Sequence, residues 1–295
     1  MTEQKNGAPG KSKTLPVPKG KLLAIGGRED KGLELTDEQK QNVDFQSMEI
    51  LERFVRELKG NNPLVAVIPT ASTVPEESAK DYIDAFGKLK INNVEVINIK
   101  SRADTKEPAF LEIMERAAGI MFTGGDQLRL TAILGGTNFL QRLKERYTHE
   151  NIIVAGTSAG AAAMSTPMIY EGQTQGGMLK GVVRITTGLE FLKDVAIDTH
   201  FIARGRIVRM AQAIATNPGC IGIGLEEDTA IMVSEGRNLE VLGNGLITVV
   251  DGMDISQTNI YEIDNGEAFT VSDLKIHFLA KGMHYKLPYF PQLHL

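Results

Sequence analysis

The chain of 295 residues is 42% apolar and 23% charged, which is ample apolar material for a large folded core. Its formal net charge of −5 at pH 7 argues against a general nucleic-acid binder, and no apolar run is long enough for a signal core or a membrane span. The single cysteine, Cys220, excludes an internal disulfide, so the default expectation is a cytoplasmic protein.

The N-terminal residues 1–20 are rich in Lys, Gly, Pro and Ser and carry few large apolar side chains, which predicts a disordered basic tail. The rest of the chain, 21–295, shows no repeat and no convincing break. We therefore expect a single domain from residue 21 onward.

Short β-branched runs alternate with stretches of helical periodicity in the first half of this domain. The predicted strands are 21–25, 64–68, 94–99, 119–122 and 152–155. The predicted helices are 44–58, 75–90, 109–118, one ending at 134, and 159–164. This alternation indicates βαβ units and a mostly parallel central sheet flanked by helices, an α/β fold. Ligands bind such sheets at the carboxyl ends of the strands, where polar loops gather.

The second half has a different pattern. A glycine-rich polar stretch, 166–187, predicts a loop or hairpin near the site. After it we expect strands at 195–201 and 221–226, a helix at 206–215, and short strands at 230–233, 239–241 and 246–250. The last segment, 275–295, is apolar but contains two prolines, so we expect an extended segment that covers the domain or forms an interface.

The stretch Gly156-Thr157-Ser158-Ala159-Gly160 joins a buried apolar run to an alanine-rich helix and fits the Gly-x-Ser-x-Gly nucleophile elbow. A sharp strand-turn-helix connection there would expose the Ser158 oxygen, and small neighbours would leave room for substrate. Backbone N–H groups at the helix start could hold a developing oxyanion. The alternative is a glycine-rich turn that binds an anion.

A serine nucleophile needs a base and an acid that orients the base. His200, in Asp198-Thr199-His200-Phe201 at the end of an apolar strand, is the best base among the five histidines. For the acid we choose Glu227, in a loop that also carries Glu226 and Asp228 as alternatives; Asp198, two residues from the base, is another. An acidic loop that is merely solvated is the simpler interpretation.

Two further groups accompany these residues. The loop 123–127 follows a strand and offers the N–H groups of Gly124 and Gly125 and the side-chain amide of Gln127, although a structural turn would look similar. Three arginines follow the proposed base closely, within residues 204–209. Guanidinium groups bind carboxylates well, so we interpret the three as binding an acidic substrate; the alternative is the solvated start of a helix. The three are Arg204, Arg206 and Arg209. No metal-binding motif is present.

With these residues assembled, the chain resembles the cyanophycinases, a group of serine peptidases that also includes aspartyl dipeptidase (peptidase E). The resemblance runs from about Lys21 to the C-terminus and rests on six motifs in order. These are Gly26-Gly27 with Glu29-Asp30-Lys31, Phe122 to Gln127, Gly156 to Gly160, Asp198 to Phe201, Arg204-Gly205-Arg206 with Arg209, and Gly222 to Ala230.

The resemblance implies a fold akin to class I glutamine amidotransferases, with Ser158 as nucleophile, His200 as base and Glu227 as orienting acid. It also implies hydrolysis of cyanophycin, a polyaspartate with arginine on each side-chain carboxyl, into β-aspartyl-arginine by a homodimer without a cofactor. The positions that match the family's substrate-binding residues are Gln127, Asp198, Arg204, Arg206 and Arg209. Thr199 stands where the family has Gln, so it is a departure at the substrate site.

The expected mechanism is acylation of Ser158 followed by hydrolysis, with an oxyanion hole formed by the Ala159 N–H and one from Gly124 or Gly125. Two rivals stand beside it. The first is an α-aspartyl dipeptidase, and the second is a non-catalytic binding module that keeps the serine turn.

Overall fold

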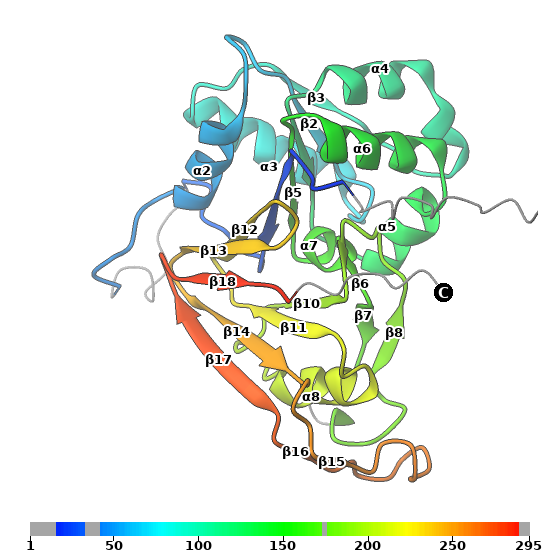
Figure 1. Cartoon of the computed structure of the whole chain (residues 1–295). Coiled ribbons are helices and arrows are strands. Elements are labelled where there is room, and N and C mark those ends of the chain that lie inside the picture. The colour runs from blue at the N-terminus through cyan, green and yellow to red at the C-terminus, as the bar shows by residue number, and fades with distance from the viewer. Residues whose placement is uncertain (1–15, 33–41, 173–175, 289–295) are drawn as a thin grey trace, which may run out of the picture.

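The computed structural model describes residues 16–32, 42–172 and 176–288. The described chain is an α/β structure built on two multi-stranded sheets with helices packed against them (Figure 1). Its helices are α2 (Glu49–Glu57), α3 (Pro75–Lys88), α4 (Pro108–Arg116), α5 (Gln127–Leu134), α6 (Asn138–His149), α7 (Ala159–Ala163) and α8 (Ile207–Thr216), with a 3₁₀ turn η1 (Ala103–Lys106). None of the helices in the described ranges is both long and apolar enough to cross a lipid bilayer.

The larger sheet has eight strands in the order β18-β13-β12-β1-β5-β4-β2-β3. Its strands are β1 (Lys21–Ile25), β2 (Val65–Ile68), β3 (Val94–Val96), β4 (Gly119–Phe122), β5 (Ile153–Thr157), β12 (Thr229–Ser234), β13 (Asn238–Gly243) and β18 (His284–Lys286). The strands β1, β5, β4, β2 and β3 are mutually parallel, and β12, β13 and β18 extend the sheet in antiparallel fashion. Because parallel strands end at one edge, the loops after β1, β4 and β5 meet there.

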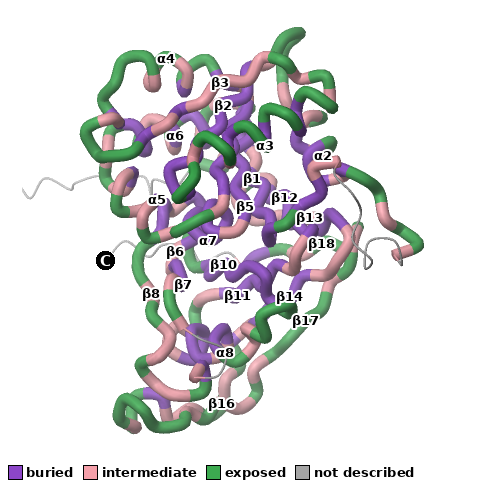
Figure 2. Tube along the Cα trace, turned by 180° about the vertical axis from the view of Figure 1, so that it is seen from behind, coloured by how far each residue is buried: buried purple, intermediate pink, exposed green. Residues whose placement is uncertain are grey.

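The two faces of this sheet bury alternate residues of the same strands, as the period of two in a strand requires. In β1, Leu23 and Ile25 pack with α2 and α3 on one face. Leu22 and Ala24 point to the opposite face, which packs with α4, α5, α6 and the second sheet. Central strands buried on both faces account for the nearly continuous apolar runs in their sequence (Figure 2).

The second sheet has six strands in the order β17-β14-β11-β10-β6-β9. These are β6 (Ser165–Thr166), β9 (Leu192–Lys193), β10 (Val195–Thr199), β11 (Ile221–Leu225), β14 (Leu246–Asp251) and β17 (Lys275–Ala280). One face joins the main core through Ile197 and Ile223, and the other carries Ala196 and Val250 against α8. Two small hairpins complete the described strands: β7 (Met168–Glu171) with β8 (Arg184–Thr186), and β15 (Gln257–Thr258) with β16 (Val271–Ser272).

Most predicted elements are present, several with shorter ends. The predicted strands 21–25 and 119–122 are confirmed to the residue, and the hairpin β7–β8 lies within the polar stretch predicted at 166–187. The predicted helix 44–58 begins later, at Glu49, and the extended segment 275–295 contributes the edge strands β17 and β18.

Three features differ from expectation. Helix α6 is absent from the predicted elements, and a second sheet stands where a single central sheet was expected. Of the predicted tail, residues 1–15 lie outside the described residues. Its last two residues are already bonded to the end of α6: Lys19 N–H donates to the Thr148 carbonyl at 3.1 Å, and Gly20 N–H donates to the Tyr147 carbonyl at 2.9 Å.

Candidate active site

Ser158 lies between the end of β5 and the start of α7, at the carboxyl edge of the parallel strands. Its φ of 50° and ψ of −111° form the sharp bend that turns the strand into the helix. The flanking glycines permit this bend because a Cβ on Gly156 would lie 2.6 Å from the Gly160 backbone, and one on Gly160 would lie 2.7 Å from the Phe122 carbonyl. The small residues of the motif therefore let α7 pack closely on β4 and β5.

His200 and Glu227 reach Ser158 from the second sheet. The strands β10 and β11 are parallel and paired, with Thr199 opposite Leu225, so the residues that follow them emerge side by side. The imidazole Nε2 of His200 lies 3.0 Å from Ser158 Oγ, and its Nδ1 lies 2.6 Å from Glu227 Oε1. A carboxylate only accepts hydrogen bonds, so Nδ1 carries the hydrogen and Nε2 is left to accept from the serine hydroxyl.

The surroundings of His200 favour its neutral form. Its imidazole is buried, and burial lowers the pKa of His200 below the ordinary value for histidine. The carboxylate of Glu227 opposes this shift, while the charges of Arg204 and Arg206 lower the pKa further. A neutral imidazole can take a proton, which is what a general base requires.

The other acids proposed to orient the base are engaged elsewhere. Glu226 accepts hydrogen bonds from the N–H groups of Ile202 and Ala203, at 2.5 and 3.0 Å, and so holds the turn that follows His200. Asp228 accepts from the Asp30 N–H at 2.9 Å. Among these neighbouring carboxylates, the geometry singles out Glu227 as the partner of the imidazole.

Asp198 is buried and forms a cluster with two of the three arginines. Its carboxylate accepts from Arg206 Nη1 at 2.9 Å and from Arg209 Nε at 2.5 Å, and also from Arg209 Nη2. A further Arg209 N–H donates to the Gly172 carbonyl at 2.8 Å, so the β7–β8 hairpin is tied to the same cluster. Arg204 is exposed on the turn beside the base.

The remaining predicted binding positions differ in accessibility. Thr199 is buried, and its N–H donates to the Asp198 carboxylate at 2.9 Å. Gln127 is half-buried at the start of α5, and its side-chain amide donates to the Ile169 carbonyl at 3.2 Å. Gly124 lies beside the serine, because a Cβ built on it would be 3.5 Å from Ser158 Cβ. The loop 123–127 therefore adjoins Ser158, as predicted from its place after β4.

The loop after β1 contributes residues that the sequence analysis did not assign to the site. Gly27 has φ 105°, and a Cβ there would lie 2.4 Å from His200 Cε1, so only glycine leaves room for the imidazole. Arg28 Nη1 donates to Glu227 Oε2 at 3.2 Å. The signal available in the sequence was a polar Gly-Gly loop at the carboxyl end of a strand that neighbours the serine strand.

Within the described residues, neither a metal-binding cluster nor another histidine accompanies this site. No group of three or more His, Cys, Asp or Glu in the described ranges could hold a metal ion. His149 ends α6, while His277 and His284 lie on the exposed edge strands β17 and β18; His294 is outside the described residues.

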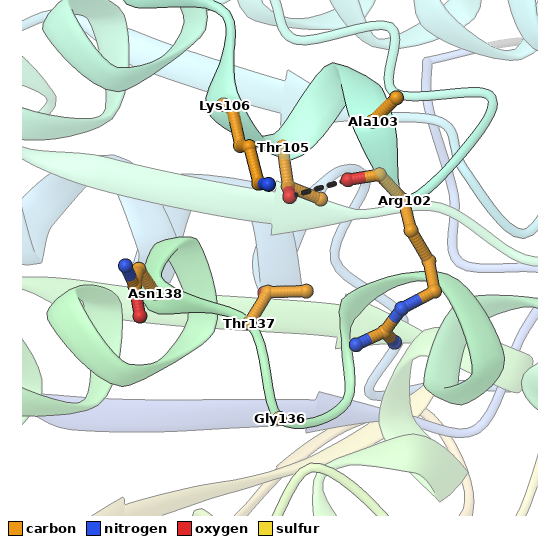
Figure 3. A pocket seen from close by; sticks show the side chains of 7 residues that line it. All are labelled: Arg102, Ala103, Thr105, Lys106, Gly136, Thr137 and Asn138. Atoms are coloured by element: carbon orange, nitrogen blue, oxygen red, sulfur yellow. Dashed lines mark hydrogen bonds between the residues drawn. The ribbon is translucent and has the colours of Figure 1, made fainter.

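A separate polar pocket lies where η1 faces the α5–α6 connection (Figure 3). Its volume is about 320 Å³, and its lining includes none of the predicted site residues. The Arg102 guanidinium at this pocket donates to the carbonyls of Ala132 and Gly135, at 2.9 and 2.8 Å, at the end of α5. Its charge therefore stabilises a helix end.

Comparisons with known proteins identify the family of the chain. The model of peptidase family S51 matches residues 39–241. A cyanophycinase of Synechococcus elongatus is 35% identical over 269 residues, covering 91% of this chain and 80% of the relative. A cyanophycinase of Geminocystis herdmanii is 31% identical over 264 residues, covering 90% and 92%.

A solved structure shares the fold. The crystal structure of a peptidase from an acI-B1 Actinobacterium aligns with a TM-score of 0.65 over 92% of this chain and 98% of that one, at 19% identity. The extent of the family match and the identity to the curated relatives lead to one conclusion: the chain belongs to peptidase family S51.

Proposed function

We propose that this chain is a cyanophycinase, a serine-type peptidase that hydrolyses cyanophycin to β-aspartyl-arginine dipeptides. The observation that carries the proposal is the hydrogen-bonded series Ser158–His200–Glu227, in a chain at least 31% identical to curated cyanophycinases over about nine-tenths of its length. A serine bonded to a base, with the base bonded in turn to an orienting acid, is an arrangement suited to acyl transfer.

The proposed reaction has two steps. Ser158 Oγ attacks a carbonyl carbon of the aspartate backbone while its proton passes to His200 Nε2. The tetrahedral intermediate collapses, the C–N bond breaks, and the imidazolium returns that proton to the leaving amine. Water then attacks the acyl-enzyme carbonyl while His200 takes its proton. The ester bond to Ser158 Oγ breaks and the imidazolium returns that proton to Ser158, so one water is consumed for each bond cleaved.

The orienting acid and the oxyanion donors complete this proposal. Glu227 fixes the tautomer of His200 and stabilises the imidazolium that forms during each step. The oxyanion hole is the Ala159 N–H with an N–H from Gly124 or Gly125. The position of Gly124 supports this, because a Cβ built on it would lie 3.5 Å from Ser158 Cβ. The turn at Ser158 is then a nucleophile elbow, supported by its position between strand and helix, and the fold a variant of the class I glutamine amidotransferase architecture.

The arginines account for an acidic substrate. We assign the exposed Arg204 and the half-buried Arg206 to free carboxylates of the substrate, which guanidinium groups bind well. In cyanophycin these carboxylates belong to the attached arginines, because each aspartyl side-chain carboxyl is taken up in an amide bond. Asp198 and Arg209, buried and bonded to each other, hold Arg206 in place. Half-buried Gln127 belongs to the same proposed surface, whereas buried Thr199 supports it, because its carbonyl accepts from Arg206 Nη1 at 2.6 Å. The enzyme would act in the cytoplasm as a homodimer without a cofactor.

The runner-up is an α-aspartyl dipeptidase of the peptidase E type, with the same chemistry on a short substrate. Parallel assays with purified cyanophycin and with Asp-x dipeptides separate the two. We expect β-aspartyl-arginine from the polymer and little turnover of the dipeptides. Turnover of the dipeptides alone, by protein shown to be folded, would select the runner-up.

A further inference from the structure

The five residues 25–29, which leave β1 at the carboxyl edge of the sheet, touch every part of the proposed triad. Three successive carbonyls of this segment accept backbone hydrogen bonds from the chain around the triad. The Ile25 carbonyl accepts from the Ser158 N–H at 2.9 Å, and the Gly26 carbonyl accepts from the His200 N–H at 3.0 Å. The Gly27 carbonyl accepts from the Asp228 N–H at 2.8 Å. The segment lies outside the residues 39–241 matched by the family model.

Glu29 is the buried charge of this segment, with 4% of its surface exposed. Its Oε2 accepts a hydrogen bond from Thr157 Oγ1 at 2.6 Å, and its Oε1 accepts one from the Tyr82 hydroxyl on α3. Lys31 Nζ lies 3.2 Å from Oε1 and supplies the compensating charge. A buried carboxylate held by two hydroxyls and a cation keeps a fixed position, because moving it would leave charge and hydroxyls unpaired.

Thr157 is the last residue of β5 and directly precedes Ser158. Ser158 has a positive φ, a conformation that persists only where the surrounding structure holds it. Its N–H is bonded to the Ile25 carbonyl, and the Thr157 side chain is bonded to Glu29, so two of the contacts that hold the bend come from the segment 25–29.

We infer that Glu29 is a positioning residue for the nucleophile, acting through the Thr157 hydroxyl to hold the Ser158 bend. The inference rests on the proposed function, in which Ser158 is the nucleophile. Glu29 does not touch the reacting atoms; it sets the place of Ser158 Oγ relative to His200 Nε2. A misplacement of about 1 Å in such a pair costs on the order of 100-fold in rate.

Thr157 and Tyr82 provide a matched pair of variants, since each donates one hydrogen bond to Glu29 but only Thr157 adjoins the serine. Thr157→Val keeps the shape and removes the hydroxyl, Thr157→Ser restores a hydroxyl, and Tyr82→Phe removes the other bond. Glu29→Gln tests the carboxylate itself. Thermal unfolding of each variant reports the loss of stability separately from the loss of rate.

The rate to measure is labelling of Ser158 by a fluorophosphonate, in which the serine oxygen bonds phosphorus, fluoride leaves and His200 takes the proton. For Thr157→Val and Glu29→Gln we expect labelling slower by about tenfold or more, and kcat on cyanophycin lower with KM little changed. Thr157→Ser recovers most of the loss, and Tyr82→Phe slows labelling by less than about threefold although it also loses a buried hydrogen bond.

The outcomes separate this inference from the proposed function. Wild-type protein that is never labelled at Ser158 would refute the proposed nucleophile. Rapid wild-type labelling, with Thr157→Val as fast as wild type or with Thr157→Val and Tyr82→Phe slowed equally, would overturn the positioning role and leave the nucleophile intact. Should Glu29→Gln fail to fold, the comparison between the Thr157 and Tyr82 variants still decides the question.

Discussion

Gly27 is a position where one added methyl group should displace the proposed base and lower activity strongly. A Cβ on Gly27 would lie 2.4 Å from His200 Cε1 and 2.6 Å from His200 Nε2. The imidazole cannot retreat freely, because its Nδ1 is bonded to Glu227 and its Nε2 faces Ser158. The variant Gly27→Ala must therefore displace the base from the triad.

The size of the effect follows from these distances. Carbon atoms are in favourable contact at about 3.5–4.0 Å, so the ring of His200 would have to move by about 1 Å. A displacement of that size costs on the order of 100-fold in kcat/KM. The φ of 105° at Gly27 is also unfavourable for alanine, and such strain costs about 1–3 kcal/mol of unfolding free energy.

The assay pairs cyanophycin hydrolysis with denaturant unfolding, and Gly87→Ala on α3 is the control. A Cβ at Gly87 meets nothing within 4 Å, so this variant should keep full activity and gain about 0.5–1 kcal/mol of helix stability. A folded Gly27→Ala protein with activity within about threefold of wild type would refute the reasoning, because the working imidazole could then not occupy the observed site.

Three other predictions rest on charges and burial. Removing the cation in Arg204→Gln stabilises the imidazolium, so the pKa of His200 should rise and the acidic limb of kcat/KM should move to higher pH; an unmoved limb would contradict this coupling. Asp198→Ala leaves Arg209 buried without its carboxylate and should lower the unfolding free energy by about 3–5 kcal/mol, measured by urea denaturation; a loss below about 1 kcal/mol would mean that the pair is solvated. Burial raises the pKa of the Cys220 thiol to about 11, so native protein at pH 8 should react with a thiol reagent far more slowly than unfolded protein; equal rates would contradict the burial.

The place of the candidate site could be predicted from the sequence because parallel strands bring their carboxyl ends together. Polar loops after successive apolar runs pointed to Ser158 and Gly124, and the paired strands β10 and β11 deliver His200 and Glu227 as their positions suggested. That inference needs only the parallel direction of the strands, which the alternation of strands and helices indicates.

The choice among Glu226, Glu227 and Asp228 depends on a different kind of information. Three adjacent carboxylates are equivalent in composition, and only the local backbone decides their directions. Asp228 has a φ of 49°, so the loop changes direction at this point. The structure shows Glu227 on the imidazole and its two neighbours holding other loops.

Long-range pairing accounts for the parts that were missed. In the second sheet β14 pairs with β11, and β17 pairs with β14. The sequences of these segments carry no mark of their partners. The link from Glu29 to Thr157 spans 128 positions and is equally invisible locally. Helix α6 is a different case, because its buried Phe139 and Leu143 are correctly spaced for a helix face and its abundant charges obscured the pattern.

The most direct test of the proposed substrate and nucleophile is digestion of purified cyanophycin by the wild-type chain and by Ser158→Ala, with mass spectrometry of the products. We expect β-aspartyl-arginine from the wild type and none from the variant, whose His200–Glu227 pair has no nucleophile to activate. Equal product release by a folded Ser158→Ala protein would contradict the assigned nucleophile, and no release by folded wild type would contradict the cyanophycinase proposal.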